Sequence, residues 1–269
     1  MSGPGAGFEY PAAEVSWLKR DVLLFANSIG CTADELHFLY HFYPQCPGQR
    51  LIQFLKPLPP TSAGKRFELR SKVIGVYDKG KVGSVVETEQ LLVEKKGGNE
   101  EDVYARMVGS AVFIGQGNWG GPKGPSTAAF PPPEGKPEGA FELKLSNEAA
   151  LLYRLNGDYN PLHATPEPGQ KMGFGGAIMH GLFSWNATCH GLLKELGGSN
   201  PANIKEFQAR FASPVKPGDK LLTEMWRTGE KKDGWEEIRF LTRVEGGKVC
   251  VSNGRAMMKC VEGGTKSKL

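Results

Sequence analysis

The chain has 269 residues, enough for one large domain or two of ordinary size. A hydrophobic fraction of 39% and a charged fraction of 23% exclude a disordered or fibrous protein. The net charge of +4 is small for this length, and no run of Lys and Arg alternates with aromatic residues, so nucleic-acid binding is not expected.

The cysteines indicate free thiols. An odd number at wide spacings, with no C-x-x-C pair, favours a reducing compartment over disulfides or zinc. The longest nearly apolar run, Val22 to Ala26, is too short to span a bilayer, and the N-terminus lacks the parts of a signal peptide. We therefore expect an intracellular soluble protein without a membrane span. The five cysteines are Cys31, Cys46, Cys189, Cys250 and Cys260.

The first half contains one candidate helix and a set of strands. The helix lies at about Val15 to Ile29, where Leu18, Val22 and Phe25 fall at helical spacing. Further on, turns rich in Lys, Asp and Gly separate stretches in which apolar and polar residues alternate, as in strands with one buried face. These strands are expected at Arg66 to Val76, Gly83 to Glu94 and Val103 to Ile114.

The same pattern occurs again in the second half. Pro57 and Pro214, 157 positions apart, each precede an alternating strand, a turn and two more strands. Gly97-Gly98 and Gly246-Gly247 supply the hairpin reversals. The repeat predicts a duplicated β-meander. Its second copy is expected at Leu221 to Arg227, Glu236 to Glu245 and Lys248 to Lys259.

Gly115 to Gly139 is crowded with Gly and Pro and is expected to be a linker. It opens with Gly115-Gln116-Gly117-Asn118-Trp119-Gly120, a literal G-x-G-x-x-G. A dinucleotide site needs a helix to begin there, so that backbone N–H groups meet the pyrophosphate. Because Gly121-Pro122 and Gly124-Pro125 follow instead, we expect no nucleotide site.

Two helices are expected before the strands of the second half. Ser146 to Leu155 has Ser and Asn for capping and Leu151, Leu152 and Leu155 on one side. Gly181 to Leu196 is longer and mostly apolar. A long apolar helix followed by a meander predicts a sheet curled around a buried helix, the α+β hotdog arrangement.

Between those helices stands Asn156-Gly157-Asp158-Tyr159-Asn160-Pro161-Leu162-His163. Asp158 and His163 would diverge on a continuous helix. However, Gly157 weakens the helix, and Pro161 pushes the residue before it out of the α region. The chain must therefore turn between the acid and the imidazole, which allows both to face one point.

An acid and an imidazole around one water molecule suit the hydration of a conjugated enoyl thioester, where water loses a proton and C2 gains one. The thioester oxygen becomes enolate-like and needs a fixed donor, for which the backbone N–H of Gly181 is in the right context. Alternatively, Asp158 only caps a turn and His163 is an ordinary surface histidine.

The run from Asn156 to His163 resembles the hydratase 2 signature of the MaoC-like dehydratases, as in the hydratase part of the peroxisomal multifunctional β-oxidation enzyme. The similarity covers nearly the whole chain except the linker and the tail. It continues through Gly176 to Leu182, Lys205 to Pro214 and Leu222 to Trp226, and in the first half through Leu55 to Pro59 and Asp78 to Gly80.

The resemblance implies a double hotdog with its active site in the C-terminal half and the reversible hydration of trans-2-enoyl-CoA to (R)-3-hydroxyacyl-CoA. Asp158 and His163 would be the acid/base pair and Gly181 the oxyanion donor. No metal or separate cofactor is expected, because coenzyme A is part of the substrate and no H-E-x-x-H spacing occurs. The family suggests a homodimer. The substrate-binding residues would be Asn160, Tyr159, Pro161, Leu162, Phe211 and Lys79.

We expect residues 1–114 to form the N-terminal hotdog-like half, 115–139 the linker, 140–262 the catalytic hotdog and 263–269 a tail. The first half is shortened near residues 41–48, where family members carry a few dozen more residues. A His-Gly pair that they use against the substrate is Pro47-Gly48 here. Lower stability than that of full-length relatives and a more open, less chain-selective acyl site are expected to follow.

Two other functions stay open. One is thioester hydrolysis on the same scaffold, since a fold does not fix a function. The other is a non-catalytic acyl-CoA-binding paralogue, motivated by the missing segment.

The chain ends in Ser267-Lys268-Leu269, the tripeptide that the peroxisomal import receptor reads at an extreme C-terminus. A polar stretch precedes it, which a receptor could grip. We therefore expect this receptor as a partner and the peroxisome as the location.

Overall fold

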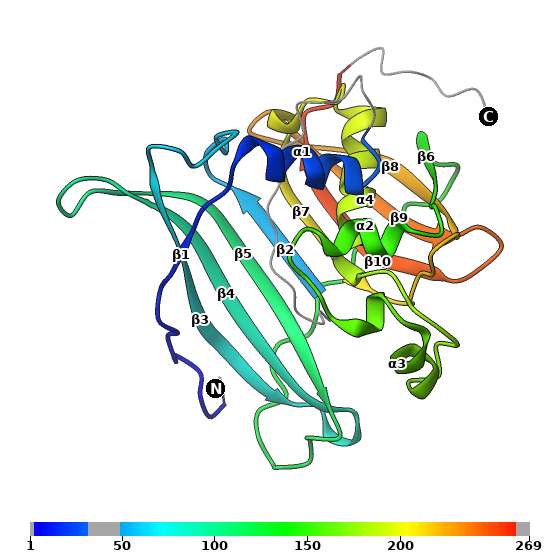
Figure 1. Cartoon of the computed structure of the whole chain (residues 1–269), viewed down its shortest axis with the longest axis horizontal. Coiled ribbons are helices and arrows are strands. Elements are labelled where there is room, and N and C mark those ends of the chain that lie inside the picture. The colour runs from blue at the N-terminus through cyan, green and yellow to red at the C-terminus, as the bar shows by residue number, and fades with distance from the viewer. Residues whose placement is uncertain (1–2, 32–48, 262–269) are drawn as a thin grey trace. The chain divides into compact units, whose positions relative to one another are not determined.

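The computed structural model describes residues 3–31 and 49–261, which fall into two units (Figure 1). Unit 1 holds the described residues 3–18 and 49–129, and unit 2 holds 19–31 and 130–261. The shortened stretch at 41–48 and the terminal Ser267-Lys268-Leu269 lie outside the described residues, so the expectations placed on them stay predictions.

Unit 1 is an antiparallel sheet in the strand order β1-β3-β4-β5-β2. All three strands expected in the first half are present. Its core contains the rings of Trp17, Phe67 and Tyr104, with centroids 4.7 and 5.2 Å apart along the series. The bounds are β1 Ala13–Val15, β2 Gln49–Phe54, β3 Arg66–Asp78, β4 Gly83–Lys95 and β5 Glu101–Ile114, with a short 3-10 helix η2 at Gly80–Val82.

The G-x-G-x-x-G stretch forms no helix, as expected, and instead wraps the carboxylate of Asp78. The backbone N–H groups of Asn118 and Gly120 each donate to Asp78 at 2.8 Å, as does that of Gly80. These donors hold the pKa of Asp78 below its ordinary value. A Cβ on Gly117 would stand 2.0 Å from the Gly80 carbonyl oxygen, so the close approach requires glycine. The motif thus binds an anion, but one from its own chain.

Unit 2 is an antiparallel sheet in the order β7-β10-β9-β8-β6, and the helix α4, Gly181–Leu196, packs against β6, β7, β8 and β10. Phe183, Trp185 and Leu192 of α4 are fully buried. The predicted sheet around a buried helix is therefore present. The strands are β6 Gly139–Lys144, β7 Ile204–Phe211, β8 Lys220–Lys232, β9 Trp235–Val244 and β10 Val249–Met258.

The first helix starts later than expected and belongs to unit 2, not to the N-terminal half. α1 covers Lys19–Ser28, because Val15 pairs with Phe67 in the sheet of unit 1. Phe25 of α1 contacts Tyr153, with ring centroids 6.5 Å apart, and Ser28 accepts a hydrogen bond from Asn156 at 2.9 Å. Apolar spacing predicted the helix, but only its partners decide which unit it joins.

The second helix, α2, is Ala149–Arg154, shorter than the predicted Ser146 to Leu155, and no side chain caps it. Its buried residues are Ala149, Ala150 and Tyr153, whereas Leu151 and Leu155 are exposed. The expected leucine face was therefore wrong, because α2 turns Tyr153 toward α1 and α4. The remaining helices are η3 Pro161–His163, α3 Pro166–Lys171 and η4 Pro201–Asn203. No helix within the described ranges is long and apolar enough to cross a membrane.

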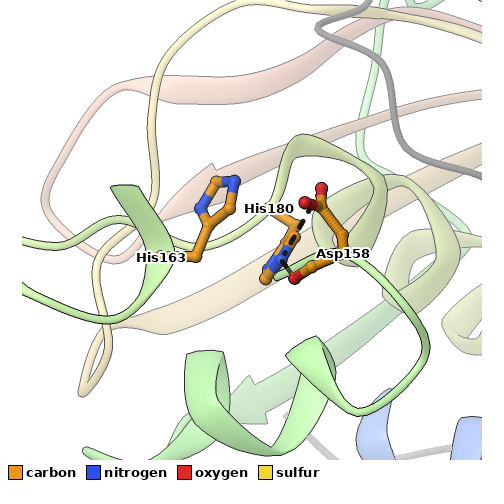
Figure 2. Close-up of side chains that lie close together, drawn as sticks. All are labelled: Asp158, His163 and His180. Carbon is orange, nitrogen blue, oxygen red and sulfur yellow. Dashed lines mark hydrogen bonds and ion pairs between the residues drawn. The ribbon is translucent and has the colours of Figure 1, made fainter. Parts of the chain in front are cut away.

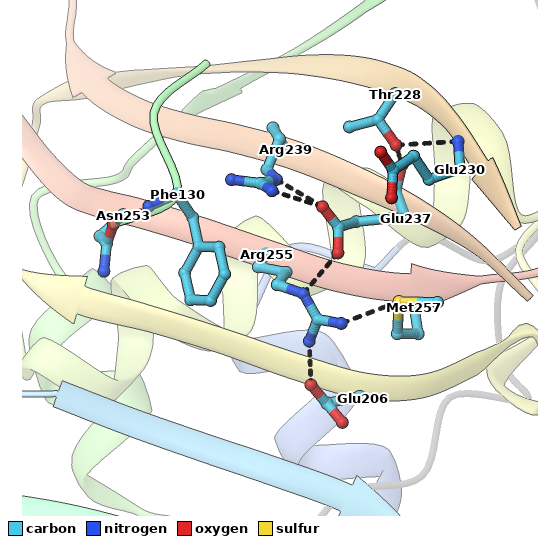
Figure 3. A network of polar contacts seen from close by, with 9 residues as sticks. All are labelled: Phe130, Glu206, Thr228, Glu230, Glu237, Arg239, Asn253, Arg255 and Met257. Carbon is cyan, nitrogen blue, oxygen red and sulfur yellow. Dashed lines mark hydrogen bonds and ion pairs between the residues drawn. The ribbon is translucent and has the colours of Figure 1, made fainter. Parts of the chain in front are cut away.

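The linker joins unit 2 at Phe130 rather than at the predicted boundary near 139 (Figure 3). The Phe130 ring lies over the guanidinium groups of Arg239 and Arg255, at 4.8 and 5.5 Å, and its N–H donates to Asn253. Glu237 bridges the two arginines, accepting at 2.8 Å from Arg239 and at 2.6 Å from Arg255. These contacts fix the point where the chain enters unit 2.

Three buried threonines connect α4 to its sheet. The Thr242 hydroxyl lies 2.6 Å from that of Thr188 and 2.8 Å from that of Thr223, and all three residues are at most 2% exposed. We expect Thr242→Val to lower the free energy of unfolding by about 1–3 kcal/mol, because the buried Thr223 hydroxyl loses its contact and the Thr188 hydroxyl keeps only its bond to the Ser184 carbonyl. Urea unfolding measures this, with the exposed Thr127→Val as control. Equal stability of the two variants would contradict the expectation.

Candidate active site

The expected turn between Asp158 and His163 is present. α2 ends at Arg154, the chain continues without regular structure, and η3 brings His163 back. The N–H of Asn160 donates to Asp158 Oδ1 at 3.2 Å, and the Asn160 side chain accepts from Leu162 at 3.0 Å. Asn160 therefore holds both ends of the turn.

His163 is buried, and one of its ring nitrogens faces a group that can only accept. Nδ1 lies 2.8 Å from the backbone carbonyl oxygen of Ile178. Because a carbonyl has no proton to give, Nδ1 carries the hydrogen in the neutral ring, and Nε2 keeps a lone pair. His163 is thereby prepared to take a proton at Nε2.

His180 lies between His163 and Asp158 (Figure 2). Its ring stacks on that of His163, with centroids 3.7 Å apart and planes at 25°. Its Nε2 lies 3.1 Å from the backbone oxygen of Asp158 and 3.8 Å from the carboxylate oxygen Oδ2. No spacing pattern in the sequence indicates a role for this residue, which immediately precedes Gly181.

The surroundings of His180 keep its ring neutral. The side chain is 3% exposed, and burial together with the neighbouring His163 lowers its pKa to about 4. Nε2 uses its hydrogen on the Asp158 carbonyl, and Nδ1 is buried with no hydrogen-bond partner in the described part of the chain. A second proton on the ring would have to bind Nδ1. No hydrogen-bond acceptor in the described part of the chain faces that atom, so the protonated ring would be unfavourable there.

The three side chains do not fit a metal ion. One ligand atom from each of Asp158, His163 and His180 lies within 4.8 Å of the others. A bound ion, however, needs lone pairs that converge on one point about 2.0–2.2 Å from each donor atom. Lone pairs lie in the plane of an imidazole ring, and these stacked planes run nearly side by side. The expectation that no metal is used stays a prediction.

α4 begins at Gly181, directly after His180. The first N–H groups of a helix have no partner inside the helix and carry the positive end of its dipole, so they can meet a developing oxyanion. A Cβ on Gly181 would stand 3.1 Å from the ring of Phe211, at the end of β7. The structure thus brings the Phe211 ring close to Gly181, the residue that follows His180.

Of the other predicted residues, Tyr159, Pro161 and Leu162 belong to the same turn as the pair, and Lys79 belongs to unit 1. Tyr159 is 63% exposed, and its carbonyl accepts from Arg154 at 3.0 Å. Pro161 starts η3, and Leu162 is buried. Lys79 lies in unit 1, where its amine contacts the Lys123 carbonyl, so its predicted role against acyl-CoA stays a prediction.

Comparison with known proteins identifies the family. The MaoC like domain profile matches residues 129–247, which include Asp158, His163, His180 and Gly181. The probable dehydratase NIT22 of Ajellomyces capsulatus is 42% identical, over 97% of this chain and 84% of that protein. The chain belongs to the MaoC-like dehydratase family. It is a hydro-lyase, as expected.

Other MaoC-like relatives support the hydratase 2 assignment and the fold. Enoyl-CoA hydratase 2, peroxisomal, of Arabidopsis thaliana is 29% identical, over 81% of this chain and 84% of that protein. A MaoC-like dehydratase from Phytophthora capsici superposes with a TM-score of 0.79 at 27% identity, covering 95% of this chain and 97% of that one. A Mycobacterium tuberculosis protein described as a double hotdog aligns with a TM-score of 0.55 at 11% identity, covering 94% and 95%. The predicted α+β double hotdog is confirmed.

The alignment with NIT22 extends over 319 positions, more than the 269 residues of this chain. That relative therefore carries residues with no counterpart here, while the expected position of the shortening, near residues 41–48, stays a prediction.

The low pKa of His180 predicts a pH-dependent stability. An unfolded histidine titrates near 6.5, whereas the folded His180 titrates at about 4. Between these values the unfolded state binds a proton that the folded state does not, so the free energy of unfolding falls with falling pH, by roughly 1–3 kcal/mol at pH 4.

Urea unfolding of the wild type and His180→Gln at pH 7, 5.5 and 4.5 measures this effect, because the difference between the two proteins isolates the one histidine. A difference that stays constant with pH would show that His180 titrates normally.

Proposed function

We propose that the protein hydrates trans-2-enoyl-CoA to (R)-3-hydroxyacyl-CoA and catalyses the reverse dehydration. The observation that carries this proposal is the approach of Asp158 and His163 at the start of α4. The two side chains come from opposite ends of one turn, and the His163 lone pair is free at Nε2. The relatives support hydration of enoyl-CoA in general, and the (R) stereochemistry and the peroxisomal role are the proposed part.

The site residues divide the reaction between them. As the water oxygen bonds to C3, one member of the Asp158–His163 pair takes the water proton, and the double-bond electrons move toward the thioester oxygen. The pair then returns one proton to C2, so both groups regain their starting protonation state. The Gly181 N–H stabilises the enolate oxygen in between. Asp158, His163 and Gly181 are the proposed catalytic residues.

Thioester hydrolysis is the second candidate, because the same scaffold can host more than one reaction. It is less favoured, since hydrolysis attacks the carbonyl carbon and has no use for a proton donor at C2. A purified sample incubated with a trans-2-enoyl-CoA distinguishes the candidates. Loss of the conjugated absorbance without free thiol indicates hydration, free thiol indicates hydrolysis, and binding without turnover indicates a non-catalytic paralogue.

We expect Asp158→Asn and His163→Ala each to lower kcat by at least ~10²-fold, because each removes half of the proton-transfer pair. Steady-state hydration measures kcat, and circular dichroism checks the fold. Lys171→Ala, on the exposed surface of α3, is the control and should keep its activity. Near-normal turnover of either site variant would overturn the assignment.

The proposed location is the peroxisome, supported by the terminal Ser267-Lys268-Leu269 and by a peroxisomal relative. The homodimer likewise remains a proposal.

A fluorescent protein fused to the N-terminus should collect in peroxisomes, and deletion of Leu269 should leave it in the cytosol. Fluorescence microscopy beside a peroxisomal marker measures this. A full-length fusion that stays diffuse would show that the tripeptide is not read.

A further inference from the structure

His180 lies at the centre of the site, although neither proton transfer of the proposed reaction uses it. It contacts Asp158 through Nε2, His163 through its ring face and Gly181 through the peptide bond. We propose that His180 is a positioning residue, whose Nε2–H holds the backbone of Asp158 and thereby sets the separation of the acid and the base. This inference rests on the proposed function.

The hydrogen bond to Asp158 is the contact that carries the proposal. Asp158 stands in a stretch without regular structure, between Arg154 and Pro161. Its side chain is 25% exposed, so packing alone does not hold it. From the N-cap position of a buried helix, the Nε2–H of His180 reaches the Asp158 carbonyl at 3.1 Å. A rigid element thus holds a loop residue, as a preorganised site requires.

The groups packed around His180 favour an uncharged imidazole ring. They are His163 on η3, Asp158 in the loop, and Tyr153 and Arg154 on α2. A proton on His180 would place a positive charge 3.8 Å from the Asp158 carboxylate and against the His163 ring. It would then weaken both bases. A neutral ring holds Asp158 without this competition.

His180 also joins the pair to the oxyanion donor. It is the residue before Gly181 and precedes the first turn of α4, and its ring contacts Tyr153 with centroids 4.9 Å apart. Asn186, one turn further along α4, donates to the Tyr153 hydroxyl at 2.9 Å. The packing of His180, Tyr153 and Asn186 therefore holds the N–H of Gly181 near the loop that carries the Asp158 carboxylate.

Three substitutions separate the possible roles. His180→Gln keeps an N–H donor at about the reach of Nε2 and has no titratable group. His180→Phe keeps a stacking ring without a donor, and His180→Ala keeps neither. We expect kcat for enoyl-CoA hydration to fall about 10- to 100-fold for Phe and Ala but less than about fivefold for Gln, with KM within about threefold throughout.

His190 supplies the matched control. It is also buried, lies in the same helix and contacts Phe141 at 5.3 Å between centroids. It is nine residues beyond Gly181, roughly 14 Å along the axis. His190→Gln and His190→Ala should lower the melting temperature as the His180 variants do, while kcat stays near that of the wild type.

The pH dependence of kcat/KM tests whether the His180 ring works in its uncharged form. Above pH 6 the profile of kcat/KM for His180→Gln should have the shape of the wild-type profile, since His180 carries no charge there. If a rising or falling part of the wild-type kcat/KM profile is absent in His180→Gln, His180 acts as an acid or a base. That result would overturn the positioning role.

Normal kcat for His180→Ala would also overturn the inference, as would equal losses for Gln, Phe and Ala. Failure of the proposed function is distinguishable. In that case the wild-type protein itself would not hydrate trans-2-enoyl-CoA, whatever the His180 variants do.

Discussion

Two backbone carbonyl groups determine the chemistry of the site. The carbonyl of Ile178 faces Nδ1 of His163, and that of Asp158 faces Nε2 of His180. Because a carbonyl only accepts, each contact places the proton on one nitrogen of the ring. His163 is left with a lone pair at Nε2, and His180 is left as a donor held against the loop. The two imidazoles lie 3.7 Å apart but have different tasks.

The position of these carbonyl groups depends on the position of α4. The helix is buried against its sheet by large side chains such as Phe183 and Trp185, and Thr188 connects it to Thr242 by a buried hydroxyl contact. A helix held this firmly can present His180 and Gly181 at its first turn with little freedom. The turn that carries Asp158 and His163 is then positioned against it. Preorganisation here follows from ordinary core packing.

α1 extends this support from an unexpected part of the sequence. It lies between β1 and β2 of unit 1 in the chain, yet Phe25 and Ser28 contact Tyr153 and Asn156. Tyr153 in turn contacts His180. α1 therefore supports the site in unit 2, although its place in the sequence would assign it to the N-terminal half.

The Gly-rich stretch at 115–120 shows how a motif can be physically correct and functionally misleading. Its backbone N–H groups do form an anion-binding loop, as such glycines permit. The anion is the carboxylate of Asp78, brought there by the β3–β4 turn. No sequence pattern announces that an internal carboxylate will occupy such a loop.

The sequence by itself determined the six strands of the two meanders, the long helix and the turn at the site, but not β1, β2, β6 or β7. Alternation with period two and Gly-rich reversals are local signals, and so is a proline that forbids a helix at Asn160. The same locality explains why Asp158 and His163 could be named as a pair, since five residues separate them. The family signature added the expected roles of Gly181 and Phe211.

Only the tertiary structure decided what depends on contacts between distant residues. His180 is 22 positions from Asp158, and nothing in its spacing indicates that it stacks on His163 and stays neutral. The buried face of α2 is another case, since Leu151 and Leu155 looked like its core but Tyr153 fills that role. Burial and protonation are properties of the neighbours that a side chain meets, and the fold alone brings those neighbours together.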